Sequence, residues 1–212
     1  MNRGRFITFE GGEGAGKSTQ SQRLVAALAG VGIDAVRTRE PGGAPGAEAV
    51  RDLLVRGAID RWDPMSEALL HYAARREHLV RTVLPALEAG RWVVSDRFAD
   101  STMAYQGYGH RLGRPPVDAL YALVVGDAAP DLTLILDLPV DDGLGRAQRS
   151  AGIEDRYERM GREFHERLRR GFLDIAAREP ERCAIIDAGP QPDTVWQAIR
   201  QTVAERLGVV WS

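Results

Sequence analysis

One glycine-rich segment near the start of the chain has the residue types and spacing of a phosphate-binding loop. Residues 11–18 read GGEGAGKS and match the pattern G-x-x-x-x-G-K-[ST] at every fixed position. Glycines let the backbone curl into a nest of N–H groups around phosphate oxygens. The helix expected to follow adds the positive end of its dipole. The motif therefore predicts binding of ATP or a similar nucleoside triphosphate together with Mg²⁺.

The loop residues have distinct expected roles. Lys17 should reach the terminal phosphates, and the Ser18 hydroxyl should complete the Mg²⁺ shell. Lys17 is the only lysine among 28 basic residues, and all the others are arginine. A chance match to the motif is therefore a poor explanation, because the planar guanidinium of arginine does not fit the confined site of an ammonium group. A dinucleotide-binding loop is excluded by spacing, since Lys17 occupies the third glycine position. The residues expected to hold the nucleotide are Gly11, Gly12, Glu13, Gly14, Ala15, Gly16, Lys17, Ser18 and Thr19.

Two charged residues follow another apolar segment. Asp96 and Arg97 end the run 92–95, and ligands of a doubly wound sheet bind outside the carboxyl ends of its strands. Asp96 can hold Mg²⁺ through water or position an acceptor. Arg97 can bind a phosphate through two parallel hydrogen bonds. The alternative is a surface pair that caps the next helix.

A polar, arginine-rich stretch lies between two helical patterns further along the chain. Since the phosphate loop contains no arginine, the charge of a phosphoryl-transfer transition state needs arginine from elsewhere. The stretch predicts a mobile lid at about residues 146–160 that closes over the transferring group. The alternative is a solvated connection between helices with surface salt bridges. Its arginines are Arg146, Arg149, Arg156 and Arg159.

The pattern of apolar residues predicts the elements that must position these groups. Strands are expected at 5–9, 33–36, 92–95, 132–138 and 182–186, and helices at 17–28, 48–55, 65–88 and 194–207. Short apolar strands separated by helices predict an α/β fold, a five-stranded parallel sheet covered on both faces. With 212 residues and 44% apolar content, the chain should form one domain, residues 1–212.

Composition limits the partners and the compartment. The net charge is −2, so neither nucleic acid nor an anionic membrane is expected as a partner. No apolar run reaches the length of about 18 residues that a membrane-spanning helix needs. The one cysteine, Cys183, cannot form an internal disulfide. These features together predict a cytoplasmic protein.

Several classes of phosphate-loop protein can be separated at this point. A guanine-reading Asn-Lys-x-Asp motif is impossible, because Asn2 and Lys17 are the only residues of their types. Large motor and transporter ATPases are excluded by size. A small kinase remains, and so does a nucleotide-binding sensor without catalysis, although a sensor does not need Asp96, Arg97 and the lid arginines.

Further motifs make the chain closely similar to the thymidylate kinase family over 6–207, essentially its whole length. Besides the phosphate loop, the resemblance rests on TREPGG at 38–43, YAAR at 72–75, DR at 96–97, ST-x-AYQG at 101–107, PDLT at 130–133 and DRYE at 155–158. Gly14-Ala15 in the loop and arginines in the lid resemble the bacterial type. The resemblance implies phosphorylation of dTMP to dTDP by ATP with Mg²⁺, in dTTP synthesis, by a homodimer.

The resemblance also implies roles for individual residues. Glu13 would lie near the sugar 3′-hydroxyl, and Tyr105 would crowd the 2′ position and disfavour ribonucleotides. Asp96 and Ser18 would be the metal-site residues. The residues implied to bind the acceptor are Glu13, Arg39, His71, Arg75, Arg97, Ser101, Thr102, Tyr105 and Gln106, and those implied to be catalytic are Lys17, Arg97, Arg149, Arg156 and Glu13.

One position departs from the family pattern. The aromatic residue that stacks on the base, usually Phe, is His71 here. Histidine can stack on a pyrimidine and donate a hydrogen bond, and its charge is expected to depend on pH near 6.5. His71→Phe is expected to keep activity and tighten dTMP binding. A different acceptor also remains open: another nucleoside monophosphate, a deoxynucleoside, or a small alcohol such as shikimate.

Overall fold

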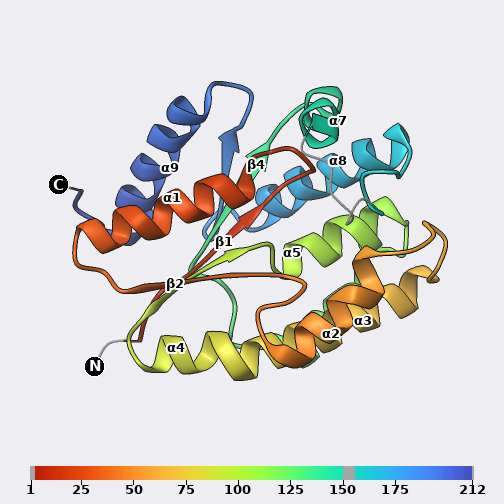
Figure 1. The fold of residues 1–212 in the computed structure, drawn as a ribbon, viewed down its shortest axis with the longest axis horizontal. Helices are drawn as coiled ribbons and strands as arrows, with labels where there is room; N and C mark the ends of the chain where they lie inside the picture. The colour runs from red at the N-terminus through yellow and green to blue at the C-terminus, as the bar shows by residue number, and fades with distance from the viewer. Residues whose placement is uncertain (1–2, 150–155, 212) are drawn as a thin grey trace.

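The computed structural model describes residues 3–149 and 156–211. Its centre is a five-stranded parallel sheet in the order β2-β3-β1-β4-β5 (Figure 1). The strands are β1 (Phe6–Glu10), β2 (Ala35–Arg39), β3 (Trp92–Asp96), β4 (Leu132–Asp137) and β5 (Cys183–Asp187). The predicted α/β fold is confirmed, and each predicted strand is present within a few residues of its expected bounds.

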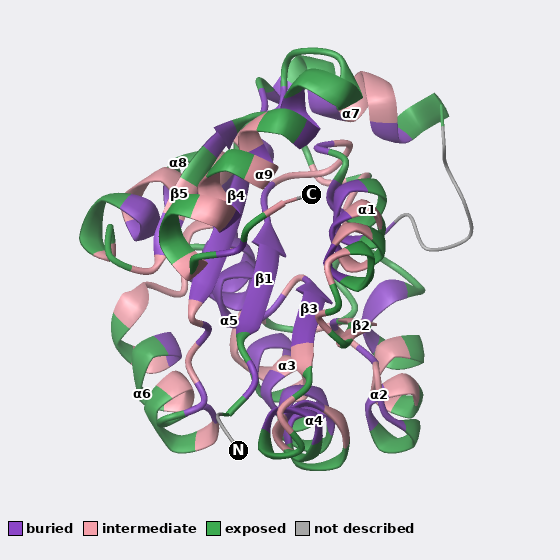
Figure 2. Cartoon of the chain, turned by 90° about the vertical axis from the view of Figure 1, so that its left-hand side faces the viewer, coloured by how far each residue is buried: buried purple, intermediate pink, exposed green. Residues whose placement is uncertain are grey.

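Successive side chains along the strands point to opposite faces of the sheet and pack into two hydrophobic cores, one on each face. On one face, Ile7 and Phe9 pack with α1 (Lys17–Gly30) and α9 (Pro192–Leu207). On the other, Phe6 packs in a core with α4 (Leu84–Glu88), α6 (Arg114–Val124) and α8 (Arg162–Arg178). Helices therefore cover both faces; β1 is buried throughout, and β3 and β4 are buried except for one end residue each (Figure 2). Burial on both faces explains why these strands are continuous apolar runs.

The helix expected at 65–88 is interrupted. It is divided into α3 (Pro64–His78), a π-helical turn η1 (Leu79–Val83) and α4. Pro85 lies just after this turn and has no N–H to donate to the carbonyl four residues earlier, so the regular ladder cannot continue through it.

Other helices were not predicted or were predicted only in outline. Residues 99–109 form α5 (Ala99–Thr102) and the π-helical segment η2 (Met103–Gly109). The predicted lid begins within α7 (Val140–Arg149) and is followed by α8. The helix predicted at 48–55 is present as α2 (Pro45–Val55). No helix within the described ranges is long and apolar enough to cross a membrane.

The strand order brings the key segments together at one edge. The chain leaves β1 for β2 on one side of the sheet, and leaves β3 for β4 on the other, although β1 and β3 are neighbours. Such a switch point leaves a crevice at the carboxyl ends of the strands. Residues 11–16, which follow β1, and Arg97, which follows β3, both lie there.

Candidate active site

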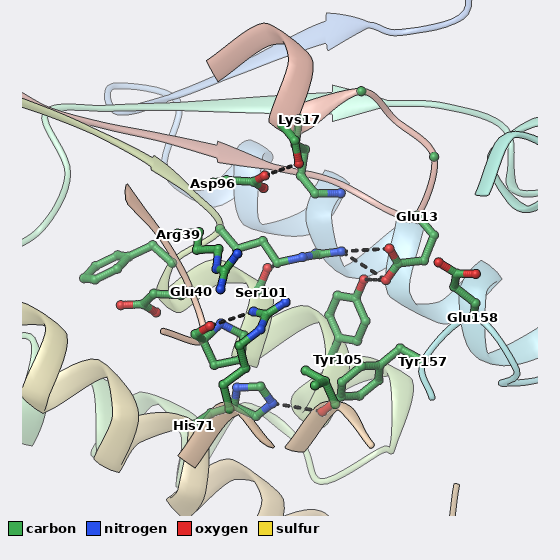
Figure 3. Close-up of a pocket in the computed structure, with 18 of the residues that line it drawn as sticks. Glu13, Lys17, Arg39, Glu40, His71, Asp96, Ser101, Tyr105, Tyr157 and Glu158 are labelled. Carbon is green, nitrogen blue, oxygen red and sulfur yellow. Dashed lines mark hydrogen bonds and ion pairs between the residues drawn. The ribbon is translucent and has the colours of Figure 1, made fainter. Parts of the chain in front are cut away.

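A cavity of about 540 Å³ opens at this switch point (Figure 3). Its walls come from the phosphate loop, the ends of β2 and β3, and the helical segments α3, α5 and η2. Most of the residues expected from the sequence line this one cavity. They are Glu13, Gly14, Gly16, Lys17, Ser18, Thr19, Arg39, His71, Arg75, Asp96, Arg97, Ser101, Tyr105 and Gln106.

The phosphate loop needs its glycines for conformation and for space. Gly11, Gly14 and Gly16 all have positive φ, at 132°, 67° and 88°. A Cβ on Gly14 would lie 2.1 Å from the carbonyl oxygen of Gly143, so a larger residue cannot be accommodated there. Gly16 leads directly into α1, whose N-terminus therefore faces the cavity.

Lys17 is buried at the centre of the loop. Its ammonium group donates to the carbonyl oxygens of Gly11 at 3.1 Å and Gly12 at 2.6 Å. Burial, and next the charge of Arg97, lower the pKa of Lys17 to about 8. The Lys17 ammonium group is therefore a compact positive charge at the point where the terminal phosphates of a bound nucleotide would contact the loop.

Ser18 and Asp96 meet beside the loop. The Ser18 hydroxyl donates to the Asp96 carboxylate, so two oxygen ligands from α1 and β3 lie together. Within residues 3–149 and 156–211 no group of three or more His, Cys, Asp or Glu side chains is arranged to hold a metal ion. One hydroxyl and one carboxylate fit Mg²⁺, which commonly takes few protein ligands and completes its shell with phosphates and water.

Arg97 and Glu13 form the charged centre of the cavity. The Arg97 guanidinium donates to both Glu13 carboxylate oxygens at 3.0 Å, and Tyr105 donates its hydroxyl to Glu13 at 2.5 Å. Burial alone would raise the pKa of Glu13, but Arg97 and Lys17 lower it to about 2. Glu13 therefore remains ionised, and its ion pair with Arg97 lies in the wall of the cavity.

The opposite wall of the cavity carries polar groups with unused hydrogen-bonding capacity. Arg75 is 2% exposed and donates to Glu40, the carbonyl of Phe98 and Thr102, but its Nη1 has no hydrogen-bond partner among the described residues. Gln106 donates its Nε2 to the buried carboxylate of Glu67 at 2.6 Å, and nothing in the described part of the chain donates to its Oε1. Since a carboxylate only accepts, the amide nitrogen must face Glu67 and the oxygen must face away from it.

His71 lies in the same wall and shares a hydrogen bond of 2.9 Å with the hydroxyl of Tyr157. Burial, and next the nearby Arg75, lower the pKa of His71 to about 3. The expectation that its charge changes near pH 6.5 is therefore wrong for the folded protein. Neutral His71 has one N–H to donate, and Tyr157 takes part in its hydrogen bonding.

Some expected site residues lie outside the cavity. Arg156 is buried: its guanidinium contacts Glu67 at 2.6 Å and donates to the carbonyls of Leu54, Ala58 and Ile59. The structure therefore places Arg156 away from the phosphate loop, anchored to the segment between α2 and α3. The arginine in the DRYE pattern gave no sign of this, because its partners are the Glu67 side chain on α3 and three carbonyl groups that lie 97 or more residues away in the chain.

The remaining differences are smaller. Thr102 is buried and accepts from Arg75 rather than facing the cavity. Ala15 packs in the core, and Gly11 and Gly12 border a second, much smaller hollow behind the loop. Arg149 is the last residue of α7 and does not line the cavity, whereas Arg146 does. Residues 150–155, which include the centre of the expected lid, lie outside the described residues.

Sequence reasoning missed several groups that shape the site. Glu40 holds Arg75 at 2.8 Å and contacts His78 at 2.9 Å, and Glu67 binds both Arg156 and Gln106. Tyr157 closes the wall beside His71. An acidic residue within a largely apolar helix face, such as Glu67, was the available signal, because a buried carboxylate requires a charged or hydrogen-bonding partner.

The fold, with a phosphate loop at the carboxyl ends of the strands and a cavity beside it, is that of a phosphate-loop kinase. The family model for thymidylate kinase matches residues 9–199, so the chain belongs to the thymidylate kinase family. Thymidylate kinase from Caulobacter vibrioides is 55% identical over 99% of this chain and 100% of its own, and that from Rhizorhabdus wittichii is 51% identical over 96% and 99%. The crystal structure of thymidylate kinase from Ehrlichia chaffeensis superposes with a TM-score of 0.79, at 37% identity over 95% of this chain and 99% of that one.

Proposed function

We propose that this protein phosphorylates dTMP to dTDP with ATP as the phosphoryl donor, a step in dTTP synthesis. The proposal rests on membership in the thymidylate kinase family over nearly the whole chain. It also rests on the cavity itself, which is lined by the phosphate loop and by Arg75 and Gln106. Each of these two residues has a buried polar atom that lacks a hydrogen-bond partner among the described residues.

The observation that favours a particular base concerns two atoms, Arg75 Nη1 and Gln106 Oε1. One is a donor and the other an acceptor, both are buried, and both belong to residues that line the cavity. Thymine and uracil present a carbonyl oxygen next to an N–H, which complements this pair. Cytosine presents an amino group next to an unprotonated nitrogen, so donor would face donor. A buried donor or acceptor left unpaired costs about 1–3 kcal/mol.

The reaction is an in-line transfer between two nucleotides. An oxygen of the dTMP phosphate forms a bond to the γ-phosphorus of ATP, and the bond between that phosphorus and the β,γ-bridging oxygen breaks, so ADP leaves. The attacking oxygen is already ionised, and no general base is needed. Lys17 and the N–H groups of the loop neutralise the donor, while Arg97, with Arg39 at the cavity's edge, holds the acceptor phosphate.

We propose that Mg²⁺ accompanies ATP at Ser18 and Asp96. The cation would draw charge from the β- and γ-phosphates. Asp96 and Ser18 orient each other through their hydrogen bond, and Asp96 is fixed at the end of a central strand.

Arginines from α7 are the candidates for neutralising the transferring group. Arg146 lines the cavity, although its guanidinium donates to the carbonyls of Ala188 and Gly189 at 2.9 Å, and Arg149 is three residues further along the same helix. Arg156 is tied to Glu67 and three carbonyls, so a direct role in the chemistry would require it to leave four partners. We propose instead that Arg156 has a structural role. Its hydrogen bonds attach the C-terminal part of the predicted lid to the segment between α2 and α3.

A coupled ADP-release assay tests the function. With MgATP fixed, dTMP, dUMP, UMP, CMP and thymidine are compared as acceptors. We expect turnover with dTMP and a kcat/KM for CMP at least about 100-fold lower, as for sites built to pair with a specific polar edge. Equal rates with dTMP and CMP would contradict the assignment of Arg75 and Gln106. Tight ATP binding with no turnover on any acceptor would instead favour a nucleotide sensor.

We also propose a homodimer. Helices α2 and α3 and the turn η1 carry exposed large apolar side chains, Leu53, Leu69 and Val80, of the kind that mark protein interfaces. Light scattering after size-exclusion chromatography should give twice the mass of the chain, and a monomer at micromolar concentration would contradict this.

A further inference from the structure

The backbone of Arg97 has an unusual conformation. Its φ is +70°, in the left-handed region that residues other than glycine rarely adopt. Only one other described residue that is not glycine, Arg111, has a positive φ. A strained conformation at the residue that carries the cavity's central cation persists only when its surroundings hold it.

Hydrogen bonds from two strands fix this turn. The N–H of Arg97 donates to the carbonyl of Phe9 at 2.9 Å, and its carbonyl accepts from the Ser95 hydroxyl at 2.7 Å. The next N–H, that of Phe98, donates to the Glu10 carboxylate at 2.7 Å. Residues at the ends of β1 and β3 therefore hold both sides of Arg97, and their side chains are buried.

Glu10 is also linked to the Arg97 guanidinium through hydrogen bonds that both residues form with the Ser101 hydroxyl group. The Ser101 hydroxyl donates to Glu10 Oε2 at 2.6 Å, and its oxygen accepts from Arg97 Nη1 at 3.2 Å. The Ser101 N–H donates to Glu10 Oε1 at 3.2 Å, so the carboxylate also holds the start of α5. One buried carboxyl group, whose pKa is raised to about 8 by burial and next by the charge of Asp100, thus orients the backbone and the side chain of the same arginine. Glu10 itself does not line the cavity.

We infer that Glu10 is a positioning residue for the phosphoryl-transfer reaction, acting through Arg97, and that Ser95 assists it on the other side of the turn. This inference rests on the proposed role of Arg97 in holding the acceptor phosphate. Glu10 contributes no contact to either nucleotide. Its effect on catalysis should therefore exist only while Arg97 is present.

A double-mutant cycle in acceptor kinetics tests this. Glu10→Ala should lower kcat/KM for dTMP about 10- to 100-fold, the loss typical of a group displaced by about an ångström. In an Arg97→Ala background, measured at high enzyme concentration, the same change should cost less than about threefold. The KM for MgATP should stay within about threefold of that of the parent enzyme, because the ATP loop keeps its own contacts.

A conservative variant and a matched control complete the design. Glu10→Gln keeps an oxygen for the Phe98 and Ser101 N–H groups and should recover most of the activity lost in Glu10→Ala. Thr8→Val removes another buried side-chain hydrogen bond from β1, the 2.8 Å bond to Thr133, away from Arg97. It should lower thermal stability without lowering kcat/KM.

Two results would overturn the inference. Equal fold-losses from Glu10→Ala with and without Arg97 would show that Glu10 supports the fold generally. Wild-type kinetics for Glu10→Ala would show that Arg97 does not need it. If Glu10→Ala does not fold, Ser95→Ala is tested in the same cycle, with the same outcomes counting for and against. If Arg97→Ala alone leaves kcat/KM for dTMP unchanged, the proposed role of Arg97 fails rather than its positioning.

Discussion

His71 should make the folded protein less stable in mild acid. An unfolded chain protonates this histidine near pH 6.5, whereas burial and nearby arginines lower its pKa to about 3 in the folded protein. Between these values the unfolded state binds more protons, so stability falls as the pH falls from about 7 toward 3. Above pH 7 both states carry neutral His71 and the contribution vanishes.

The size of the effect follows from the same two pKa values. Between pH 7 and pH 5, linkage gives a loss of about 2 kcal/mol in the free energy of unfolding. Part of the ring faces the cavity and is solvated there, so we expect about 1–2 kcal/mol. The variant His71→Phe keeps an aromatic ring and removes the titration.

The assay is urea unfolding of both proteins at pH 5, 6 and 7. The free energy of unfolding of the wild type should fall more steeply with acidity than that of His71→Phe, by about 1–2 kcal/mol over this range. Other histidines contribute to both proteins and cancel in the difference. The loss of the Tyr157 hydrogen bond shifts the variant by an amount that does not depend on pH. Parallel pH profiles would refute a neutral, buried His71.

The remaining predictions concern activity and packing. Lys17→Met should abolish turnover with MgATP in the ADP-release assay, and near-normal activity would contradict the transfer mechanism. Arg97→Lys, which cannot form the paired bonds to a phosphate, should raise the KM for dTMP about tenfold or more and leave the KM for MgATP unchanged. Removing Mg²⁺ with EDTA should stop turnover, and added Mg²⁺ should restore it; full activity in EDTA would exclude the Ser18–Asp96 site. Arg156→Met should lower the free energy of unfolding by about 3–5 kcal/mol because it leaves the buried Glu67 carboxylate without its arginine partner; a large loss of kcat with unchanged stability would favour a catalytic Arg156.

Local sequence patterns were sufficient for the sheet and the phosphate loop. The three central strands β1, β3 and β4 are mostly buried, which favours apolar runs, and the loop needs glycine at positions with positive φ. The pattern was less informative at 65–88, where apolar periodicity continues through η1 although the hydrogen-bond ladder changes at Pro85. The spacing of apolar residues shows which face of a helix is buried. It does not show to which carbonyl oxygen each backbone N–H donates, and so it does not reveal a π-helical turn.

The class of reaction can be predicted from local sequence: a phosphate loop with its single lysine, an Asp-Arg pair after a strand, and the motifs of one kinase family. Which of those residues contact one another follows from the three-dimensional fold. It joined Glu13, Arg97 and Tyr105 into one charged centre, moved Arg156 into a buried pair with Glu67, and kept His71 neutral. Those outcomes depend on burial and on partners distant in the chain, since desolvation and the Coulomb field of neighbouring charges arise only when distant segments pack together.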